Sequence, residues 1–269
     1  MRGLGWLVGP GPVQREGGVA IVVAHPDDET IGCGSQLWRL PDAALVVVTD
    51  GAPQAPEKAL RAGFLSPGHY AEARARELRA ALAFADFPGD RLQALNVPDG
   101  AVWRFQGQII AGLRRFFEAR GIAWVLTHAF EGGHSDHDGV AYCVNRAAAG
   151  MAFGGPSIIE MPFYHLGAGG LRSQAFCDGA PGVELRLGPA ETARKMAMFG
   201  AFASQGPTLL QMDPGVERYR LAARRAIDAP PNGGRLKYDP NEPAFGVPDW
   251  MKPRARAAPR LRSAVKRVA

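Results

Sequence analysis

Continuous apolar runs alternate with amphipathic stretches between residues 19 and 160, and this alternation limits the possible folds more than any other feature of the chain. Residues 19–24 (VAIVVA) and 44–49 (ALVVVT) are rich in β-branched side chains, which is typical of strands buried on both faces of a sheet. Residues 69–85 instead place alanine and leucine side chains on one stripe, as an amphipathic helix does. The alternation predicts right-handed βαβ units, in which a helix follows each strand and packs on the sheet.

The same pattern predicts five strands and the four helices that connect them. The strands are expected at residues 19–24, 44–49, 92–97, 122–127 and 157–160. The helices are expected at residues 30–40, 69–85, 106–120 and 138–149. The predicted fold class is therefore α/β: a Rossmann-like, doubly wound, mostly parallel sheet flanked by helices, with the active site at the carboxyl ends of the strands.

The signal weakens after residue 165. Residues 184–187 are predicted to form an edge strand and residues 189–203 a helix. Residues 205–252 are dense in Pro and Gly and are expected to be irregular covering structure. No linker divides residues 1–251, so these residues are predicted to form a single domain.

All of the net positive charge comes from the last 18 residues. The 269-residue chain carries 31 Lys and Arg against 26 Asp and Glu, a formal net charge of +5. Residues 252–269 contain seven of the basic residues and no acid, which leaves 24 basic and 26 acidic residues, net −2, in the rest of the chain. We therefore expect a basic, flexible tail at 252–269, and no nucleic-acid partner for the nearly neutral body.

Cysteine usage and hydropathy predict the cellular setting. The three cysteines are far apart and never in C-x-x-C spacing, which favours free thiols in a reducing compartment. The longest uninterrupted apolar runs reach six residues, whereas a membrane-spanning helix needs about 20. We expect a soluble, cytoplasmic protein without a membrane span.

The segment Ala-His-Pro-Asp-Asp-Glu, residues 24–29, directly follows the first predicted strand. Ligands of open parallel sheets bind outside the carboxyl ends of the strands, so this segment lies where a site is expected. Histidine with aspartate is a donor set suited to Zn²⁺, and adjacent carboxylates without a cation would repel one another. The structural alternative is that Asp27 or Asp28 only caps the following helix.

A second polar cluster, Glu-Gly-Gly-His-Ser-Asp-His-Asp at residues 131–138, follows the fourth predicted strand. One of its two histidines could bind a metal while the other serves acid–base chemistry, and the aspartate between them can orient an imidazole. Alone this cluster could be a solvated loop, but both clusters fall on the same predicted edge of the sheet. Gly32-x-Gly34 lacks the third glycine of a dinucleotide loop, which disfavours nucleotide binding there.

At these residues the sequence resembles the LmbE-like or PIG-L-like zinc-dependent N-deacetylases. Both motifs of that family, A-H-P-D-D-E and G-H-x-D-H, are intact at residues 24–29 and 133–137. Weaker similarities at Arg74-x-x-Glu77, at Pro98-Asp99-Gly100 and at residues 195–205 extend the resemblance over most of residues 19–210. Phe202 departs from the polar residue that many members carry there, and this affects no expected metal ligand.

The resemblance implies a hydrolase that removes an N-acetyl or other N-acyl group from an amino sugar or glycoconjugate. It implies that His25, Asp28 and His137 bind Zn²⁺ or another divalent ion, which activates water by lowering its pKa. It further implies that Asp27 is the general base, with His134 the acid or electrostatic partner, oriented by Asp136. The remaining alternatives are an amidase of the same family acting on a non-sugar amide, and a nucleic-acid-binding protein that uses the basic tail.

Five further side chains are candidates for contact with a small-molecule substrate: Arg74, Trp103, Glu131, Tyr164 and His165. Each has a structural alternative. Arg74 could pair with Glu77 or Asp86, and Trp103 could belong to the core. A homo-oligomer is left open.

Overall fold

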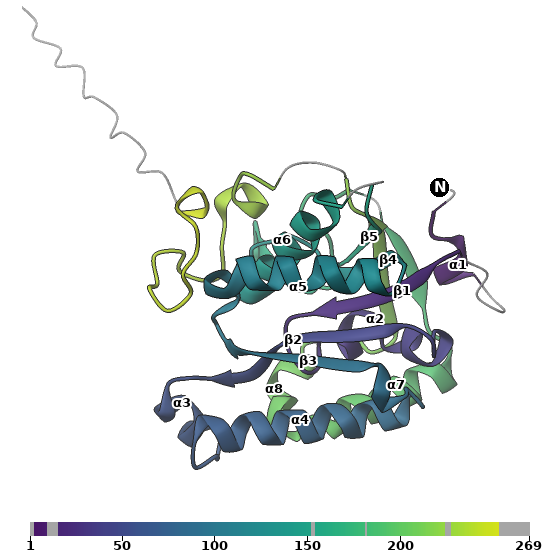
Figure 1. Ribbon diagram of the computed structural model, residues 1–269. Coiled ribbons are helices and arrows are strands. Elements are labelled where there is room, and N and C mark those ends of the chain that lie inside the picture. The colour runs from purple at the N-terminus through teal and green to yellow at the C-terminus, as the bar shows by residue number, and fades with distance from the viewer. Residues whose placement is uncertain (1–2, 10–15, 152–153, 181, 224–226, 253–269) are drawn as a thin grey trace, which may run out of the picture.

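The predicted α/β architecture is confirmed. The computed structural model describes residues 3–9, 16–151, 154–180, 182–223 and 227–252. Within them a seven-stranded sheet has the order β3-β2-β1-β4-β5-β9-β8 (Figure 1). Strands β3 to β5 of this order run parallel, and β9 and β8 are added antiparallel. The order reverses direction between β1 and β4, so these two strands form the switch point at which such sheets bind ligands.

The strands of the main sheet are β1 (Gly18–Val23), β2 (Ala44–Pro53), β3 (Leu92–Asp99), β4 (Ile122–His128), β5 (Ser157–Met161), β8 (Val183–Arg186) and β9 (Val216–Leu221). A separate antiparallel hairpin consists of β6 (Tyr164–Gly167) and β7 (Gly170–Ser173). The helices are α1 (Gly5–Val8), α2 (Asp28–Arg39), α3 (Pro56–Arg61), α4 (Pro67–Phe84), α5 (Gln106–Ala119), α6 (Ser135–Ala149), α7 (Pro189–Ala201) and α8 (Gly206–Leu209). Short 3₁₀ helices occupy Gly89–Arg91, Val102–Phe105, Ala203–Gln205, Pro231–Gly234 and Asp249–Met251.

Helices cover both faces of the sheet, which explains why the sequence of β1 is apolar throughout. Helices α2, α4 and α7 lie on one side of the sheet and α5 and α6 on the other (Figure 1). Ile21 and Val23 belong to the core on the side of α2, α4 and α7, whereas Ala20 and Val22 belong to the core under α5 and α6. Successive strand residues point to opposite faces, so burial on both faces removes the apolar–polar alternation of a surface strand.

Three differences from the sequence prediction bear on the site. Helices α2 and α6 begin at Asp28 and Ser135, two and three residues earlier than predicted, so the polar motifs themselves form their first turns. Strand β9 lies within residues 205–252, which were expected to be irregular. Its sequence, VERYRL, carries three charged residues, which conceal the apolar pattern of a strand. The strand accommodates these charges because each is paired with a residue of another element.

Among the helices described, none combines the length and apolar character needed to cross a membrane. Of the predicted basic tail at 252–269, all but Lys252 lies outside the described residues, so its flexibility stays a prediction. The edge strand expected at 184–187 is confirmed as β8, and the helix expected at 189–203 is α7.

Candidate metal centre and active site

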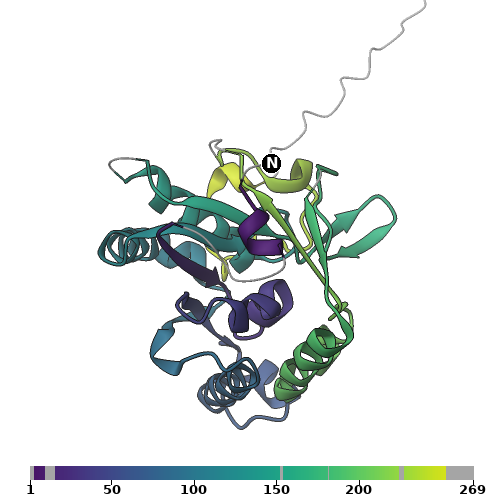
Figure 2. The ribbon, with the colours of Figure 1, turned by 90° about the vertical axis from the view of Figure 1, so that its right-hand side faces the viewer.

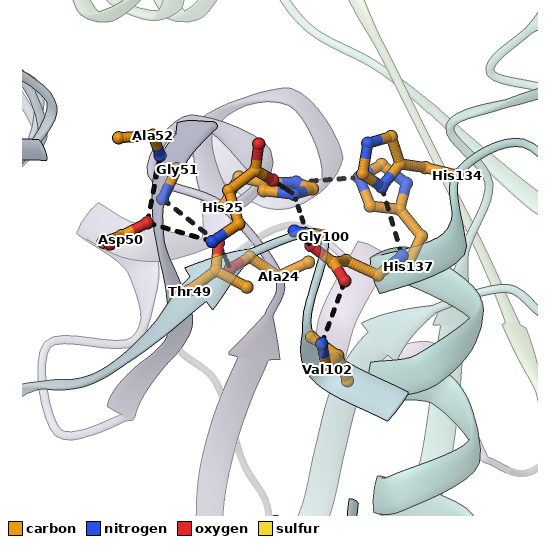
Figure 3. A network of polar contacts seen from close by, with 12 residues as sticks. Ala24, His25, Thr49, Asp50, Gly51, Ala52, Gly100, Val102, His134 and His137 are labelled. Atoms are coloured by element: carbon orange, nitrogen blue, oxygen red, sulfur yellow. Dashed lines mark hydrogen bonds and ion pairs between the residues drawn. The ribbon is translucent and has the colours of Figure 1, made fainter. Parts of the chain in front are cut away.

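The two polar motifs meet at the carboxyl ends of β1 and β4, which pair directly in the sheet. His25, Asp27 and Asp28 come from the turn after β1 and the start of α2. His134 and His137 come from the start of α6, and Figure 3 shows their rings facing that of His25. Four of the five residues are buried, and His134 is partly buried. The expectation that both motifs lie on one edge of the sheet is therefore confirmed.

His25, His137 and Asp28 converge on one point. The Nδ1 atom of His25 lies 3.2 Å from Nε2 of His137 and 3.2 Å from Oδ2 of Asp28. The Nε2 atom of His137 lies 3.3 Å from Oδ1 of Asp28. Ligand atoms at about 2.0–2.1 Å from a tetrahedral zinc ion are separated by about 3.3 Å, so the donor types and spacing fit a divalent cation bound by these three residues.

The other ring nitrogen of His25 faces two carboxylates. Its Nε2 lies 3.0 Å from Oδ1 of Asp99 and 3.4 Å from Oδ2 of Asp136. When the ring is neutral, a proton held on Nε2 by these carboxylates leaves the lone pair on Nδ1, which faces His137 and Asp28 as in carboxylate–histidine–metal arrangements. Burial opposes protonation of His25, but hydrogen bonds with Asp136, Asp28 and Asp99 outweigh it and raise the pKa of the ring well above its usual value.

Asp99 also lies at the site, although in the sequence it carried only the weak Pro98-Asp99-Gly100 similarity. It ends β3, next to β2, and its backbone N–H donates to Oδ1 of Asp50 at 3.1 Å. Burial acts to raise the pKa of Asp99, but the hydrogen bond and charge of His25 outweigh it and lower the pKa below its usual value. The signal available in the sequence was its position, since Asp99 also follows a predicted strand.

Asp27 occupies a backbone conformation that disfavours side chains. Its φ is 131° and its ψ is −25°, in the positive-φ region where a Cβ is strained. The backbone N–H of Asp27 donates to Oε2 of Glu29 at 3.1 Å, and its Oδ2 lies 3.4 Å from Nη2 of Arg74. Burial raises the pKa of Asp27 to about 6, although the charge of Arg74 acts in the opposite direction.

Asp28 remains acidic in the same surroundings. Burial acts to raise the pKa of Asp28, but the charge of His137 and hydrogen bonds with His137 and His25 outweigh it and hold the pKa well below its usual value. Its Oδ2 also accepts the backbone N–H of His25 at 2.7 Å. The two neighbouring carboxylates therefore differ: Asp28 is an anion suited to a ligand, whereas Asp27 titrates close to neutrality.

His134 begins α6 as its N-cap residue. Its Nδ1 accepts the backbone N–H of Asp136 at 3.2 Å, so the proton of the neutral ring is on Nε2. Burial, followed by the charges of His25 and His137, lowers the pKa of His134 to about 4. The ring stands edge-on to His25, with centroids 4.7 Å apart.

Asp136 makes contacts other than those expected. Its carboxylate accepts the backbone N–H groups of Gly100 and Val102, at 2.6 and 3.2 Å, and faces His25. His134 is oriented by the backbone of Asp136 and not by its carboxylate. The first turn of α6 projects that carboxylate toward the end of β3, away from the ring two residues earlier.

His128 is near the site but is occupied elsewhere. Its ring stacks on that of His137, with centroids 4.1 Å apart. Its Nε2 accepts the backbone N–H of Ala24 at 2.8 Å, which leaves no lone pair there for a metal. Burial and the charge of His137 lower the pKa of His128 well below its usual value, so the ring is a neutral packing partner.

The five substrate candidates separate into two groups. Arg74 is buried beside Asp27, and the ring centroid of Tyr164 lies 5.6 Å from that of His137, so both border the site. Trp103 is 1% exposed within an aromatic cluster and cannot stack on a sugar.

The other two candidates are also occupied or turned away. The carboxylate of Glu131 accepts the backbone N–H groups of Phe163 and Tyr164, at 2.6 and 3.0 Å. His165 is buried on the far side of the β6–β7 hairpin from Tyr164. Neither faces the His25–His137 centre.

Residues 20–148 match the model of the family described as PIG-L, GlcNAc-PI de-N-acetylase. No curated protein matches the chain. Among solved structures, the N,N′-diacetylchitobiose deacetylase from Pyrococcus horikoshii is 16% identical with a TM-score of 0.56, over 83% of this chain and 90% of that one. The zinc-inhibited form of a teicoplanin deacetylase is 13% identical with a TM-score of 0.54, over 76% and 98%.

The same fold also carries a different reaction. The 4-carboxy-2-hydroxymuconate hydratase from Pseudomonas putida is 16% identical with a TM-score of 0.59, over 78% of this chain and 98% of that one. At such identities the likeness establishes the fold alone. The reaction has to be inferred from the residues at the site.

Proposed function

We propose that this chain, which belongs to the PIG-L family through residues 20–148, is a metal-dependent hydrolase. The proposed reaction removes an acyl group, in the first instance acetyl, from the nitrogen of an amino sugar or glycoconjugate. The observation that carries the proposal is the mutual spacing of 3.2–3.3 Å among His25 Nδ1, His137 Nε2 and the carboxylate oxygens of Asp28. The similar deacetylase of N,N′-diacetylchitobiose supports an acylated amino sugar as the substrate class.

His25, Asp28 and His137 are the proposed ligands of zinc or another divalent ion. Bound there, the ion would lower the pKa of a water molecule and polarise the amide carbonyl. Asp99 and Asp136 hold the proton of His25 on Nε2, which keeps Nδ1 available as a donor to the ion.

Asp27 is the proposed general base. Its carboxylate has a pKa of about 6, close to neutral pH, where a base is most effective. Arg74 pairs loosely with it at 3.4 Å, which fixes the direction of the carboxylate without forming a tight bidentate pair. Asp27 can thus accept the proton of the attacking water.

His134 is the proposed partner of the developing oxyanion. With a pKa lowered to about 4, its ring is neutral before the reaction, and Nε2 carries the only ring proton. That N–H can donate to negative charge developing on the carbonyl oxygen. Asp27, which has taken up the proton of the water, can then deliver that proton to the leaving amine, because a neutral His134 ring that lost its only proton would become an imidazolate.

Acetate release with and without metal tests the proposal. The protein would be assayed as purified, after chelation, and after addition of zinc, cobalt or manganese, on N-acetylglucosamine, diacetylchitobiose, N-acetylglucosaminides and non-sugar acetamides. We expect release from a sugar acetamide that is lost on chelation and restored by one of the ions. Activity that survives complete metal removal would refute the metal chemistry, and release from the non-sugar acetamides alone would assign the amidase alternative.

A further inference from the structure

A second polar cavity lies behind the β6–β7 hairpin, on the opposite side of that hairpin from the candidate metal centre. It has a volume of about 470 Å³ and is lined by residues of the hairpin, of 175–180, of strands β8 and β9 and of the turn at 232–235. The hairpin extends beyond the main sheet (Figure 2). Tyr164 faces His137 while its neighbour His165 lines the cavity, because successive residues of a strand point to opposite faces.

His165, which lines this cavity, has an incomplete set of hydrogen-bond partners. His165 is 3% exposed. Its Nδ1 faces Oε2 of Glu131 at 3.6 Å, longer than a hydrogen bond, and neither atom has a hydrogen-bond partner in the described part of the chain. No residue described here bonds to Nε2 of His165 either. Buried polar side chains normally have partners, so His165 leaves a hydrogen-bonding position that a ligand or a water molecule can fill.

The lining of the cavity contains three arginines but only one acid, Glu184. Arg172 is the register partner of His165 across the hairpin, so both side chains lie on the same face of it. Within the described ranges, Arg172 has no ion pair, and the side chain of Arg235 contacts only Oδ1 of Asn232, at 3.5 Å. The third arginine, Arg218, is paired with Glu184, the one acid of the lining. Arg172 and Arg235 are thus two uncompensated cations beside the buried ring.

We propose that this cavity is a binding site for a small oxyanion, a phosphate or carboxylate group, held between His165, Arg172 and Arg235. Guanidinium groups bind such anions through charge-assisted hydrogen bonds, and the buried imidazole offers a further donor when it is protonated. The anion belongs either to a remote part of the substrate or to a separate small molecule. The site does not depend on the proposed reaction, because occupancy can be measured without turnover.

Titration with inorganic phosphate, followed by NMR of the histidine side chains in the metal-loaded protein, tests the site. The signal of His165 is identified by its absence in His165→Gln, and those of His134 and His137 report phosphate that binds at the metal centre instead. We expect the His165 signal to shift at millimolar phosphate or below. In Arg172→Gln/Arg235→Gln the apparent Kd for that shift should rise at least about tenfold, whereas the exposed control Arg115→Gln should leave it unchanged.

An unshifted His165 signal, or a shift that the double variant leaves intact, would overturn the proposal. Kinetics then identify the source of the anion. If KM rises in the double variant for phosphorylated N-acetyl sugars but not for neutral ones, the anion is part of the substrate. If phosphate changes the rate on a neutral substrate in the parent but not in the double variant, the anion is a separate effector.

Discussion

His25 shows at the scale of one residue how much the sequence could predict. Its position after a buried strand and its motif predicted a metal ligand, and the structure places its Nδ1 against His137 and Asp28. Its second partner, Asp99, could not be predicted, because it lies 74 residues away and the contact depends on how β3 ends relative to β1. Sequence spacing reveals ligands that share a motif, whereas hydrogen bonds between distant segments require the assembled fold.

The first residue-scale prediction concerns Asp27. Asp27→Asn should keep the metal but lower kcat by about two to four powers of ten, because the amide cannot accept the proton of water. In the parent protein, kcat/KM should fall as pH drops below about 6, since the active form of Asp27 is deprotonated and its pKa is about 6. Glu72→Gln, at an exposed helical pair, is the control. Unchanged turnover in Asp27→Asn would remove this residue from the role.

Asp99→Asn is the second residue-scale prediction. The amide holds the Nε2 proton of His25 less strongly, so the metal affinity should fall about 10- to 100-fold while the fold persists. Competition with a chromophoric chelator measures the affinity. The exposed Asp90→Asn should bind metal like the parent, and equal affinity in Asp99→Asn would show that Asp99 does not support His25.

The starts of α2 and α6 explain how the two polar motifs come together at the candidate site. The sequence placed the starts of α2 and α6 too late because apolar periodicity begins only after the polar motif. His134 is also an unusual N-cap, since Ser, Thr, Asp and Asn are the preferred types. The helical first turns point Asp28 and His137 toward the same edge of the sheet, and the propensities of those residues gave no indication of this.

The loop before α6 depends on a close approach that only glycine allows. A Cβ on Gly133 would lie 1.8 Å from the backbone oxygen of Tyr164. Gly133→Ala should therefore destabilise the protein by about 1–3 kcal/mol and lower activity by displacing His134. Gly112→Ala, in the open interior of α5, should instead stabilise it by about 0.5–1 kcal/mol. Urea denaturation of both variants checks this, and equal effects would contradict it.

Three elements are joined by one buried ion pair. Lys195 of α7 donates to Glu217 of β9 at 2.8 Å and to the backbone oxygen of Ile31 in α2 at 2.9 Å. Lys195→Met should cost about 3–5 kcal/mol of unfolding free energy because it leaves Glu217 buried and unpaired. Lys195→Met/Glu217→Gln should recover part of that loss. A double variant as unstable as the sum of its single changes would show that the charge is not the cause.

The whole molecule follows the predicted architecture most closely where contacts are local in the sheet. The strand–helix alternation was sufficient to predict the parallel half, since each βαβ unit is specified by adjacent sequence. The antiparallel addition of β9 and β8 was only half predicted, because β9 is stabilised by partners from α2, α7 and β5 and not by its own pattern.

The basic C-terminal segment supplies the whole-molecule prediction. A chain ending at residue 251 should release acetate at the parent rate, because the site is formed by segments between residues 25 and 164. Any salt-sensitive binding of nucleic acid should be lost in the same truncation. A parallel assay of acetate release and of nucleic-acid binding at two salt concentrations measures both. A large loss of turnover would place part of the active site in the tail.

The positive φ of Asp27 lowers the stability of the fold. At φ 131° a glycine would be the more stable residue, and the strain of holding an aspartate there is on the order of 1–3 kcal/mol. Glycine at this position would relieve that strain. If Asp27 is the general base proposed above, the strain is what its placement costs the stability of the fold.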